Sequence, residues 1–427
     1  MSNKSKNNFD RNYWALTFEG TAFIGGISML ATGGVIALFI DRLTGSITLV
    51  GLAITIQPLF LLLGQLFVAP HIKSIKNLPG FLFKMMSLRI LPFFMAIPLF
   101  LGLNSGLAVG IALALFALFW LSDGINTVPW GELTARALKP EVRGHMMGFH
   151  VALGNGLSLL TGLLLTWLLA TPLLTEHNRF GLIFTIGSAI LLTSLIFIRM
   201  VKDPAPTLNP PSEKPSFRKY YADIPALLRR SKHLRRAVVA RIPAYIGFST
   251  ITFVLVIGSN IIDISRDQIA WLPYSQIVGA LIGGYFLGRI SRQWGNKTVI
   301  LLCNVGVIIT IAMAIALAIF PGLGYIWLLL TCVFAGIWSN NWLGYFNYFL
   351  DIARKDERPA FQVIGNCIGI PFSFIGLIIG AVIDRFGFIV AFAFGAIAAI
   401  VTIRFSLRLL SRSEINELED VDIVEGV

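Results

Sequence analysis

Cysteine and charge are both scarce in this sequence. The three cysteines, Cys303, Cys332 and Cys367, lie in apolar runs without any short paired spacing. This pattern excludes a disulfide framework and a cysteine zinc site. Only 13% of the 427 residues are charged, whereas 56% are hydrophobic. A chain with so little charge holds more apolar surface than a soluble core can bury, so lipid is the expected solvent for most of it.

Acidic residues are the scarcer of the two charge signs. The sequence has 22 Asp and Glu against 34 Lys and Arg, a formal net charge of +12. Such an excess fits nucleic acid or an anionic membrane surface, but here the charges lie between hydrophobic stretches. With a cytoplasmic amino terminus, the outside loops hold only Arg42, Arg179, Arg266 and Arg385. The positive-inside rule therefore predicts a multi-pass protein of the plasma or inner membrane, with both termini cytoplasmic and no nucleic-acid partner.

Long apolar runs are abundant. A helix needs about 20 mainly apolar residues to cross ~30 Å of hydrocarbon, and these runs are too long and too uniformly apolar for the strands of a membrane barrel. The first run continues from the polar residues 1–11 without a cleavage site, so that helix is expected to remain. Twelve spans are predicted: residues 14–40, 47–69, 81–103, 106–130, 144–170, 180–201, 240–262, 268–290, 298–320, 323–350, 360–383 and 388–410.

One long polar segment divides the chain nearly in half. Residues 202–238 carry five prolines followed by a run of basic residues. The predicted organisation is therefore a six-helix bundle over 1–201, a basic linker over 202–238, a second six-helix bundle over 239–412 and an acidic tail over 413–427. The second part of the linker is either an amphipathic helix on anionic lipid or a solvated basic segment.

The two halves share short motifs in the same order. Asn178-Arg179-Phe180-Gly181 matches Asp384-Arg385-Phe386-Gly387, and each follows an upstream match. There, Glu141, Arg143 and Gly154-Asn155 correspond to Glu357, Arg358 and Gly365-Asn366. This order is expected of a duplicated six-helix unit with parallel repeats.

A loop rich in glycine and basic residues joins the eighth and ninth predicted spans. It contains Gly284, Gly288, Arg289, Arg292, Gly295 and Lys297. With these residues, the chain from 14 to 410 resembles the major facilitator superfamily, which implies an all-α fold of twelve transmembrane helices in two pseudo-repeats. The glycines of this loop let helices approach closely, and its basic side chains can contact helix carboxyl ends or a neighbouring acid. The gating-loop candidates are Gly284, Gly288, Arg289, Arg292, Gly295 and Lys297.

Two details refine this resemblance. Pro129-Trp130 with Glu141 and Arg143 is similar to the cation-coupled glycoside symporter branch. The loop over residues 64–79 lacks the acid of the family pattern, and Gly288 stands where the family often has Asp. The family's charge-relay gating is therefore not carried over to this chain. The glycine-proline motif of drug antiporters is absent from the fifth span.

Three charged residues lie well inside predicted spans, away from the span ends, namely Glu19, Arg89 and Asp123. Insertion into hydrocarbon costs each about 2.5–3.5 kcal/mol, which favours a functional role. We expect them to meet in one layer as coupling or ion-binding residues. Glu19 has no basic neighbour in the sequence, whereas Arg89 and Asp123 form either a structural ion pair or part of the coupling machinery.

Polar side chains on other spans are the candidate substrate ligands. The resemblance implies that spans one, four, seven and ten line a central cavity. Amides, hydroxyls and phenols at helical spacing there can hydrogen-bond a polar solute. The candidates are Asn126, Thr127, Trp130, Tyr245, Ser249, Asn340, Asn341, Tyr345, Asn347, Tyr348, Gln362 and Asn366. His145 and His150 are five residues apart, a poor spacing for one helical face, so no metal site is predicted.

These features predict a secondary transporter and not an enzyme. No Walker loop or catalytic triad order is present, and no cofactor is expected. The expected partners are a small polar or amphipathic organic solute, a coupling proton or sodium ion, and membrane lipids, with a monomer as the functional state. Symport is the first interpretation, and drug or lipid efflux or flipping by the same fold is the second. The alternative from another class is a nontransporting membrane enzyme or scaffold.

Overall fold

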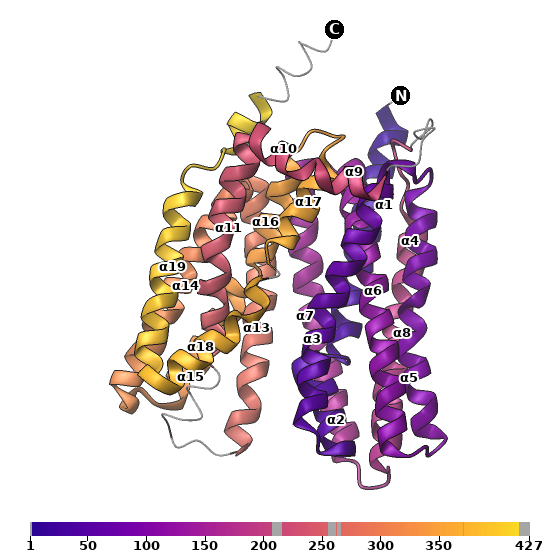
Figure 1. Cartoon of the computed structure of the whole chain (residues 1–427), viewed down its shortest axis with the longest axis vertical. Coiled ribbons are helices and arrows are strands. Elements are labelled where there is room, and N and C mark those ends of the chain that lie inside the picture. The colour runs from indigo at the N-terminus through magenta and orange to yellow at the C-terminus, as the bar shows by residue number, and fades with distance from the viewer. Residues whose placement is uncertain (1, 207–215, 255–261, 263–265, 370, 418–427) are drawn as a thin grey trace. The chain divides into compact units, whose positions relative to one another are not determined.

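The computed structural model describes all residues except 1, 207–215, 255–261, 263–265, 370 and 418–427. Within the described residues the chain is helical and contains no strand (Figure 1). It divides into two compact units, described here separately. Unit 1 comprises Met1–Lys139 and Leu153–Tyr220, and unit 2 comprises Pro140–Ala152 and Tyr221–Val427.

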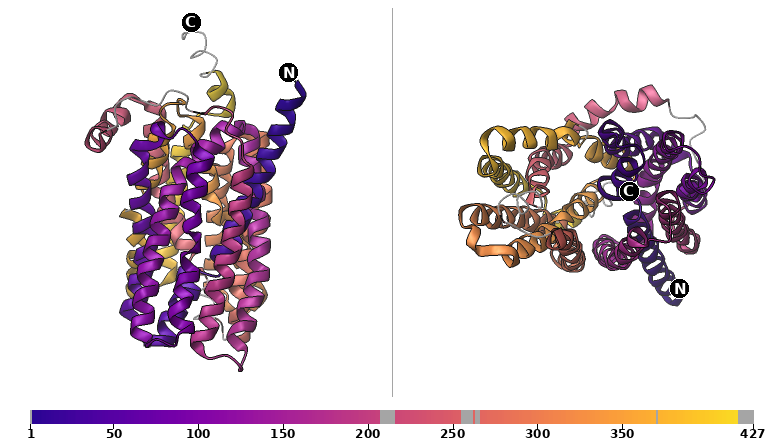
Figure 2. Two further views of the ribbon diagram at one scale, coloured as in Figure 1. Left: turned by 90° about the vertical axis from the view of Figure 1, so that its right-hand side faces the viewer. Right: turned by 90° about the horizontal axis from the view of Figure 1, so that it is seen from below.

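Unit 1 is built from long helices interrupted by short turns of tighter or wider pitch. The helices run along one another, as the end-on view in Figure 2 shows. They are α1 (Ser2–Ser28), η1 (Thr32–Ile36), α2 (Ala37–Thr44), α3 (Ile47–Val68), η2 (Ala69–Ser74), α4 (Leu78–Met86), η3 (Ser87–Ile90), α5 (Leu91–Phe100), α6 (Ser105–Ala137) and α8 (Glu176–Met200). α7 (Pro140–Ala170) begins in unit 2 and ends in unit 1, and α9 (Phe217–Ala222) crosses the same division.

Unit 2 has the same all-helical construction. Its elements are α10 (Ile224–Arg230), α11 (Lys232–Ile251), α13 (Arg266–Trp294), α14 (Asn296–Ile319), η4 (Pro321–Leu323), α15 (Gly324–Ser339), α16 (Asn341–Asp351), α17 (Arg358–Cys367), η5 (Pro371–Phe374), α18 (Ile375–Phe386) and α19 (Phe388–Ser406). The predicted seventh span ends at residue 262, so most of its second half lies outside the described residues.

Capping side chains mark where several helices begin. A hydroxyl or amide oxygen that accepts a backbone N–H of the first turn satisfies one of the helix's unpaired donors. Asn104 does so for α6, with its Oδ1 2.9 Å from the nitrogen of Leu107. The same role falls to Ser46 at α3, Asn77 at α4, Thr175 at α8 and Ser231 at α11.

Among the described residues, eight helical segments are long and apolar enough to cross a membrane. They correspond to the second to sixth, ninth, tenth and twelfth predicted spans. The other four predicted spans do not meet the same test among the described residues: the first is broken by η1, the eleventh is broken at η5, and the seventh and eighth adjoin residues that are not described. The count of twelve spans therefore stays a prediction.

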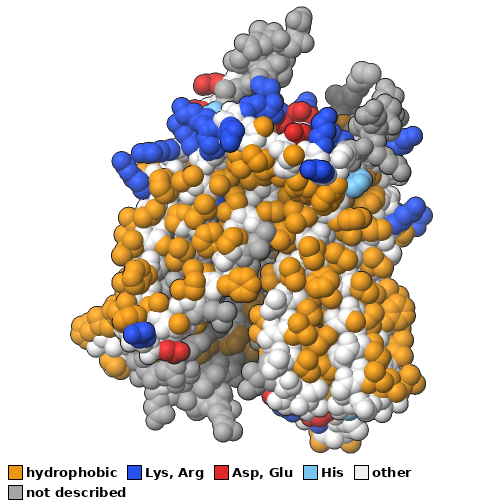
Figure 3. Space-filling model, in the orientation of Figure 1, with side chains coloured by type: hydrophobic (Ala, Val, Ile, Leu, Met, Phe, Trp, Pro, Cys, Tyr) orange, Lys and Arg blue, Asp and Glu red, His pale blue; other side chains and the backbone are white. Residues whose placement is uncertain are grey.

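The flanks of the helices are apolar. Phe67, Trp167 and Ile326 expose 62%, 62% and 72% of their surface, as large side chains do when lipid covers them. Figure 3 shows hydrophobic side chains over the helical flanks and, on unit 2, Lys and Arg gathered at the end that carries α10. The chain is a multi-pass membrane protein.

The linker contains packed structure. Ile224, Leu227 and Leu228 of α10 pack against the buried core of unit 2, and Arg230 forms an ion pair with Glu357. This part of the predicted linker is therefore a helix packed on unit 2, and both alternatives for its exposed basic side chains, anionic lipid or solvent, stay predictions.

The repeated Arg-Phe-Gly motif adopts two different local structures. Gly387 has a φ of +81° and separates α18 from α19, a conformation that favours glycine. Gly181 instead lies inside α8, where a Cβ atom would come within 2.7 Å of the Phe100 ring. The sequence repeat therefore does not extend to equivalent backbone geometry at this motif.

Candidate functional site

A buried charge cluster forms in unit 1 around Arg89. Its Nη1 donates to Glu19 Oε1 at 2.8 Å and to Ser194 Oγ at 2.5 Å, and its Nη2 lies 3.5 Å from Asp123 Oδ1. Glu19, Arg89 and Asp123 expose only 2%, 3% and 8% of their surface. The structure thus brings together the three charged residues that the sequence predicts inside spans.

Local backbone structure presents the Arg89 side chain to this cluster. Pro92 lacks an N–H and its ring crowds the preceding turn, so regular helix is interrupted and Arg89 lies in η3. The Ser188 hydroxyl donates to the Arg89 carbonyl at 3.0 Å. The Phe23 ring centroid lies 4.6 Å from the guanidinium carbon, a cation–π distance.

Both carboxylate oxygens of Glu19 have donors. Trp130 Nε1 donates to Glu19 Oε2 at 2.8 Å, while Arg89 binds the other oxygen. Trp130 belongs to the predicted polar stripe on α6. Thr127, on the same stripe, donates to the backbone carbonyl of Asp123 at 3.0 Å.

Asn126, also on this stripe, has side-chain polar atoms that make no hydrogen bond among the described residues. It is 3% exposed, and neither its side-chain oxygen nor its nitrogen has a hydrogen-bond partner among the described residues. A buried amide without partners is costly unless something else satisfies it. Asn126 is therefore the candidate ligand of this stripe best placed to bind a solute.

The cluster holds two carboxylates and one cation. When all three are ionised the formal charges sum to −1, and uptake of one proton makes the sum zero. An uncompensated charge is unfavourable in a low-dielectric site. Whether the cluster binds a proton or a cation therefore depends on the polarity of its surroundings.

Glu19 is the closer partner of Arg89. Glu19 has no basic neighbour in the sequence, and Arg89 lies 70 residues away in the chain. The contact of Arg89 with Glu19 is shorter than its contact with Asp123. Arg89 therefore contacts both acids, and the two predicted roles of Arg89 and Asp123, a structural ion pair or part of the coupling machinery, stay predictions.

A second site is a cavity of about 190 Å³ in unit 2. Three predicted residues, Tyr245, Asn341 and Tyr345, line it together with Arg241. Arg241 Nε donates to the Tyr245 hydroxyl at 2.9 Å. Its guanidinium carbon lies 5.4 Å and 5.2 Å from the ring centroids of Tyr245 and Tyr345, and 5.6 Å from that of Phe349.

Arg241 is the residue that sequence reasoning missed. It lies at the start of the predicted seventh span, where a basic residue fits the positive-inside pattern and attracts no notice. Its position four residues before Tyr245, one helical turn, was the available signal.

The remaining predicted ligands of unit 2 separate into different environments. Asn340 donates to the Ala280 carbonyl at 2.8 Å, and the Tyr348 hydroxyl accepts from the Leu410 nitrogen at 2.9 Å. Asn347 is fully buried and accepts from Arg143 Nε at 3.0 Å. Four of the five polar residues of span ten therefore hydrogen-bond within unit 2, including Tyr345, and their role as one ligand-binding stripe stays a prediction.

Three other predicted ligands, Ser249 of span seven and Gln362 and Asn366 of span eleven, do not line the cavity. The Ser249 carbonyl accepts from Thr252 Oγ1 at 2.7 Å, and Ser249 does not line the cavity. Gln362 of α17 is 3% exposed, and its amide nitrogen has no partner among the described residues. The Asn366 backbone carbonyl accepts from Gly369 at 3.0 Å. None of the three borders the cavity.

The predicted glycine loop lies at a close helix crossing within unit 2. A Cβ atom on Gly148 of α7 would lie 2.4 Å from both the Gly284 carbonyl oxygen and the Gly288 Cα of α13. Only glycines allow the backbones to approach so closely. Gly295, with a φ of +80°, then separates α13 from α14.

The basic residues of this loop have different partners. Lys297 Nζ donates to the Leu409 carbonyl at 2.6 Å, and the Arg292 carbonyl accepts from Arg412 at 2.5 Å. Arg289 Nη1 donates to the Tyr285 hydroxyl at 3.0 Å.

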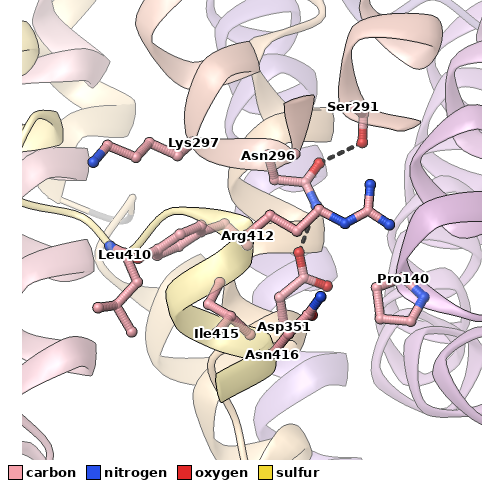
Figure 4. A pocket seen from close by; sticks show the side chains of 11 residues that line it. Pro140, Ser291, Asn296, Lys297, Asp351, Leu410, Arg412, Ile415 and Asn416 are labelled. Atoms are coloured by element: carbon pink, nitrogen blue, oxygen red, sulfur yellow. Dashed lines mark hydrogen bonds between the residues drawn. The ribbon is translucent and has the colours of Figure 1, made fainter. Parts of the chain in front are cut away.

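Beside this loop, Asp351 organises a polar network that the sequence did not predict (Figure 4). Arg143, fully buried, forms an ion pair with one carboxylate oxygen of Asp351. Asn296 Nδ2 donates to the other at 2.6 Å, and Ser291 Oγ donates to Asn296 Oδ1 at 2.7 Å. The partners are 55 to 208 residues apart in sequence, which is why spacing did not group them.

Comparisons with known proteins agree with this architecture. Residues 237–422 match the family model described as Major Facilitator Superfamily. The E. coli fucose:proton symporter FucP is 13% identical, with a TM-score of 0.72 over 93% of this chain and 98% of that one. The proton:xylose symporter XylE bound to 6-bromo-6-deoxy-D-glucose is 12% identical, with a TM-score of 0.68 over 97% and 99% of the two chains.

A human protein shares the same fold. The organic anion transporter MFSD10 is 14% identical, with a TM-score of 0.66 over 93% of this chain and 99% of that one. No curated protein matches the sequence significantly. At these identities the solved structures show the fold.

Proposed function

We propose that this protein, whose residues 237–422 match the Major Facilitator Superfamily model, is a secondary active transporter that moves a small polar or amphipathic organic solute by alternating access. The observation that carries the proposal is the buried Glu19–Arg89–Asp123 cluster of unit 1. A chain that only spans or scaffolds a membrane has no need of three buried ionisable groups, each of which is costly in hydrocarbon.

We propose proton symport as the coupling mode. Two carboxylates share one guanidinium, so a single proton neutralises the cluster and changes which state of the protein is favoured. Both Glu19 oxygens accept hydrogen bonds from N–H donors, so neither can coordinate a sodium ion without competing with a donor. FucP and XylE, which have the same fold, are named as proton symporters of sugars.

The test uses purified protein in vesicles with imposed proton or sodium gradients. Glu19→Gln mimics the protonated acid, so it should abolish gradient-driven accumulation while sparing exchange of solute at equal concentrations. Glu132→Gln is the matched control: Glu132 is 5% exposed and paired with Arg136, which keeps Asp203 as a partner. It should accumulate solute as the wild type does.

Two outcomes would overturn the proposal at different levels. Concentrative uptake by Glu19→Gln at the wild-type rate, across a range of external pH and sodium, removes Glu19 from the mechanism. Vesicles that neither accumulate, exchange nor flip any member of a broad solute and lipid panel remove transport itself and favour the scaffold alternative.

A further inference from the structure

We propose that the Arg241 cavity of unit 2 binds the carboxylate group of a small, soluble organic acid. This inference rests on the proposed transport function and names the class of solute. Its basis is a guanidinium in a mainly apolar cavity that is held in place by aromatic rings and has no carboxylate partner.

The charge of Arg241 is uncompensated within the part of the chain that is described. Arg89, Arg136, Arg143 and Arg179, whose side chains are at most 15% exposed, each form an ion pair with a carboxylate. Arg241 instead hydrogen-bonds the neutral Tyr245 hydroxyl and faces three aromatic rings. Ring faces attract a cation but do not neutralise it, so the cavity retains a positive charge that favours an anion.

Packing contacts hold the side chains around Arg241 in place. The Tyr245 ring stacks on Phe372, with centroids 5.6 Å apart and planes 4° from parallel. A Cβ atom at Gly369 would lie 2.7 Å from the Tyr245 hydroxyl, so glycine leaves the room that this hydroxyl occupies. Tyr345 is 1% exposed and donates to the Ala240 carbonyl at 3.1 Å. These contacts hold the rings around Arg241 before any ligand arrives.

The chemistry of the lining selects the anion. A guanidinium presents parallel N–H groups that match a carboxylate, and one such cation suits a monoanion. The Asn341 side-chain oxygen is buried and unpartnered; rotation of the amide presents its NH₂ instead, a second donor for the ligand. Phe248 and Trp342 supply apolar surface for the body of the acid.

Size points to a small ligand. The cavity volume of about 190 Å³ is below the roughly 300–1,000 Å³ of pockets that hold drug-sized molecules. An acid of the size of lactate or benzoate fits this description better than a long-chain lipid.

The experiment compares acids with their uncharged amides on the purified full-length protein. The probes are lactate and lactamide, benzoate and benzamide, and nicotinate and nicotinamide, with decanoate and decanamide to test a lipid-like source of the same group. Binding is measured as the rise in apparent unfolding temperature and as Kd by calorimetry. At least one soluble acid should bind 10-fold or more tightly than its amide.

Substitutions of Arg241 test whether the preference for the acid over its amide depends on this side chain. Arg241→Gln should abolish the preference for the acid, and Arg241→Lys should retain part of it, because lysine keeps the charge without the planar fork. Arg385→Gln is the matched control, since Arg385 also lies over an aromatic ring of unit 2, at 5.8 Å from Phe386. It should leave Kd unchanged.

The outcomes separate this inference from the proposed function. Equal binding of every acid and its amide, a preference for decanoate alone, or unchanged acid binding by Arg241→Gln would overturn the soluble-acid site. Transport of a neutral sugar at the same rate by wild type and Arg241→Gln would overturn it while transport stands. Acid binding without any transport would support the site and overturn the transporter proposal.

Discussion

Each unit holds an arginine away from bulk water, and the two units surround that arginine with different partners. In unit 1, Arg89 has two carboxylates and a serine hydroxyl as partners. In unit 2, Arg241 has a phenol and three aromatic rings. The first arrangement is an excess of negative charge that one proton neutralises, and the second is a positive charge without a counter-ion. The difference suggests that unit 1 serves coupling and unit 2 serves recognition of the solute.

The largest expected effect comes from removing the cation of unit 1. Arg89→Gln leaves Glu19 and Asp123 buried together without compensation, which should destabilise the protein by about 3–5 kcal/mol. Arg241→Gln removes a charge that has no carboxylate partner, so its loss should be at most about 1 kcal/mol, the scale of one cation–π contact. The measurement is the free energy of unfolding in detergent.

Arg199→Gln controls for loss of an arginine in unit 1. Arg199 is exposed and lies 5.6 Å from the Phe83 ring, so its removal should be nearly neutral. Equal destabilisation by Arg89→Gln and Arg241→Gln would contradict the contrast between the units.

Variants of Asp351 test whether an arginine–carboxylate pair in unit 2 affects stability as the cluster of unit 1 does. Asp351→Asn leaves Arg143 buried without its carboxylate and should cost about 3 kcal/mol or more. The double variant Arg143→Met with Asp351→Leu removes both charges and should recover much of the loss. Thermal unfolding of the single and double variants measures the recovery, and a double variant less stable than Asp351→Asn would show that the pair itself stabilises unit 2.

Trp130→Phe has a smaller expected effect on the cluster of unit 1. It removes the indole donor from Glu19 Oε2 while keeping an aromatic side chain. A hydrogen bond to a charged group contributes about 1.5–3 kcal/mol. Because the indole no longer orients the Glu19 carboxylate, gradient-driven uptake should slow several-fold. An uptake rate equal to that of the wild type would separate Trp130 from the coupling step.

Tyr245→Phe is the mildest test, made on the recognition side. It deletes the hydroxyl that accepts from Arg241 and keeps the ring that stacks on Phe372. A hydrogen bond to a charged group contributes about 1.5–3 kcal/mol, and the guanidinium keeps its ring contacts, so stability should fall by no more than the lower end of that range while acid binding weakens several-fold. Calorimetric Kd values for benzoate check this, and an affinity equal to that of the wild type would show that the phenol does not orient Arg241.

Part of the candidate site was predictable. Charged residues in apolar spans stand out because hydrocarbon penalises them, so Glu19, Arg89 and Asp123 were found without a structure. Arg241 was missed because a basic residue near a helix end has an ordinary topological explanation. The network around Asp351 was missed because Asp351 lies at the end of an apolar span, where an acid is normally solvated, and its partner Arg143 is 208 residues away.

The sequence by itself determined the solvent, the class of fold and the existence of most spans, because hydropathy and helix length act locally along the chain. Only the tertiary structure decided which charges meet. Glu19 and Arg89 are 70 residues apart, and a one-turn error in either helix would separate them. It also decided that the same Arg-Phe-Gly motif lies inside α8 in one copy and ends α18 in the other. Contacts between helices depend on how side chains pack in three dimensions, which local periodicity does not encode.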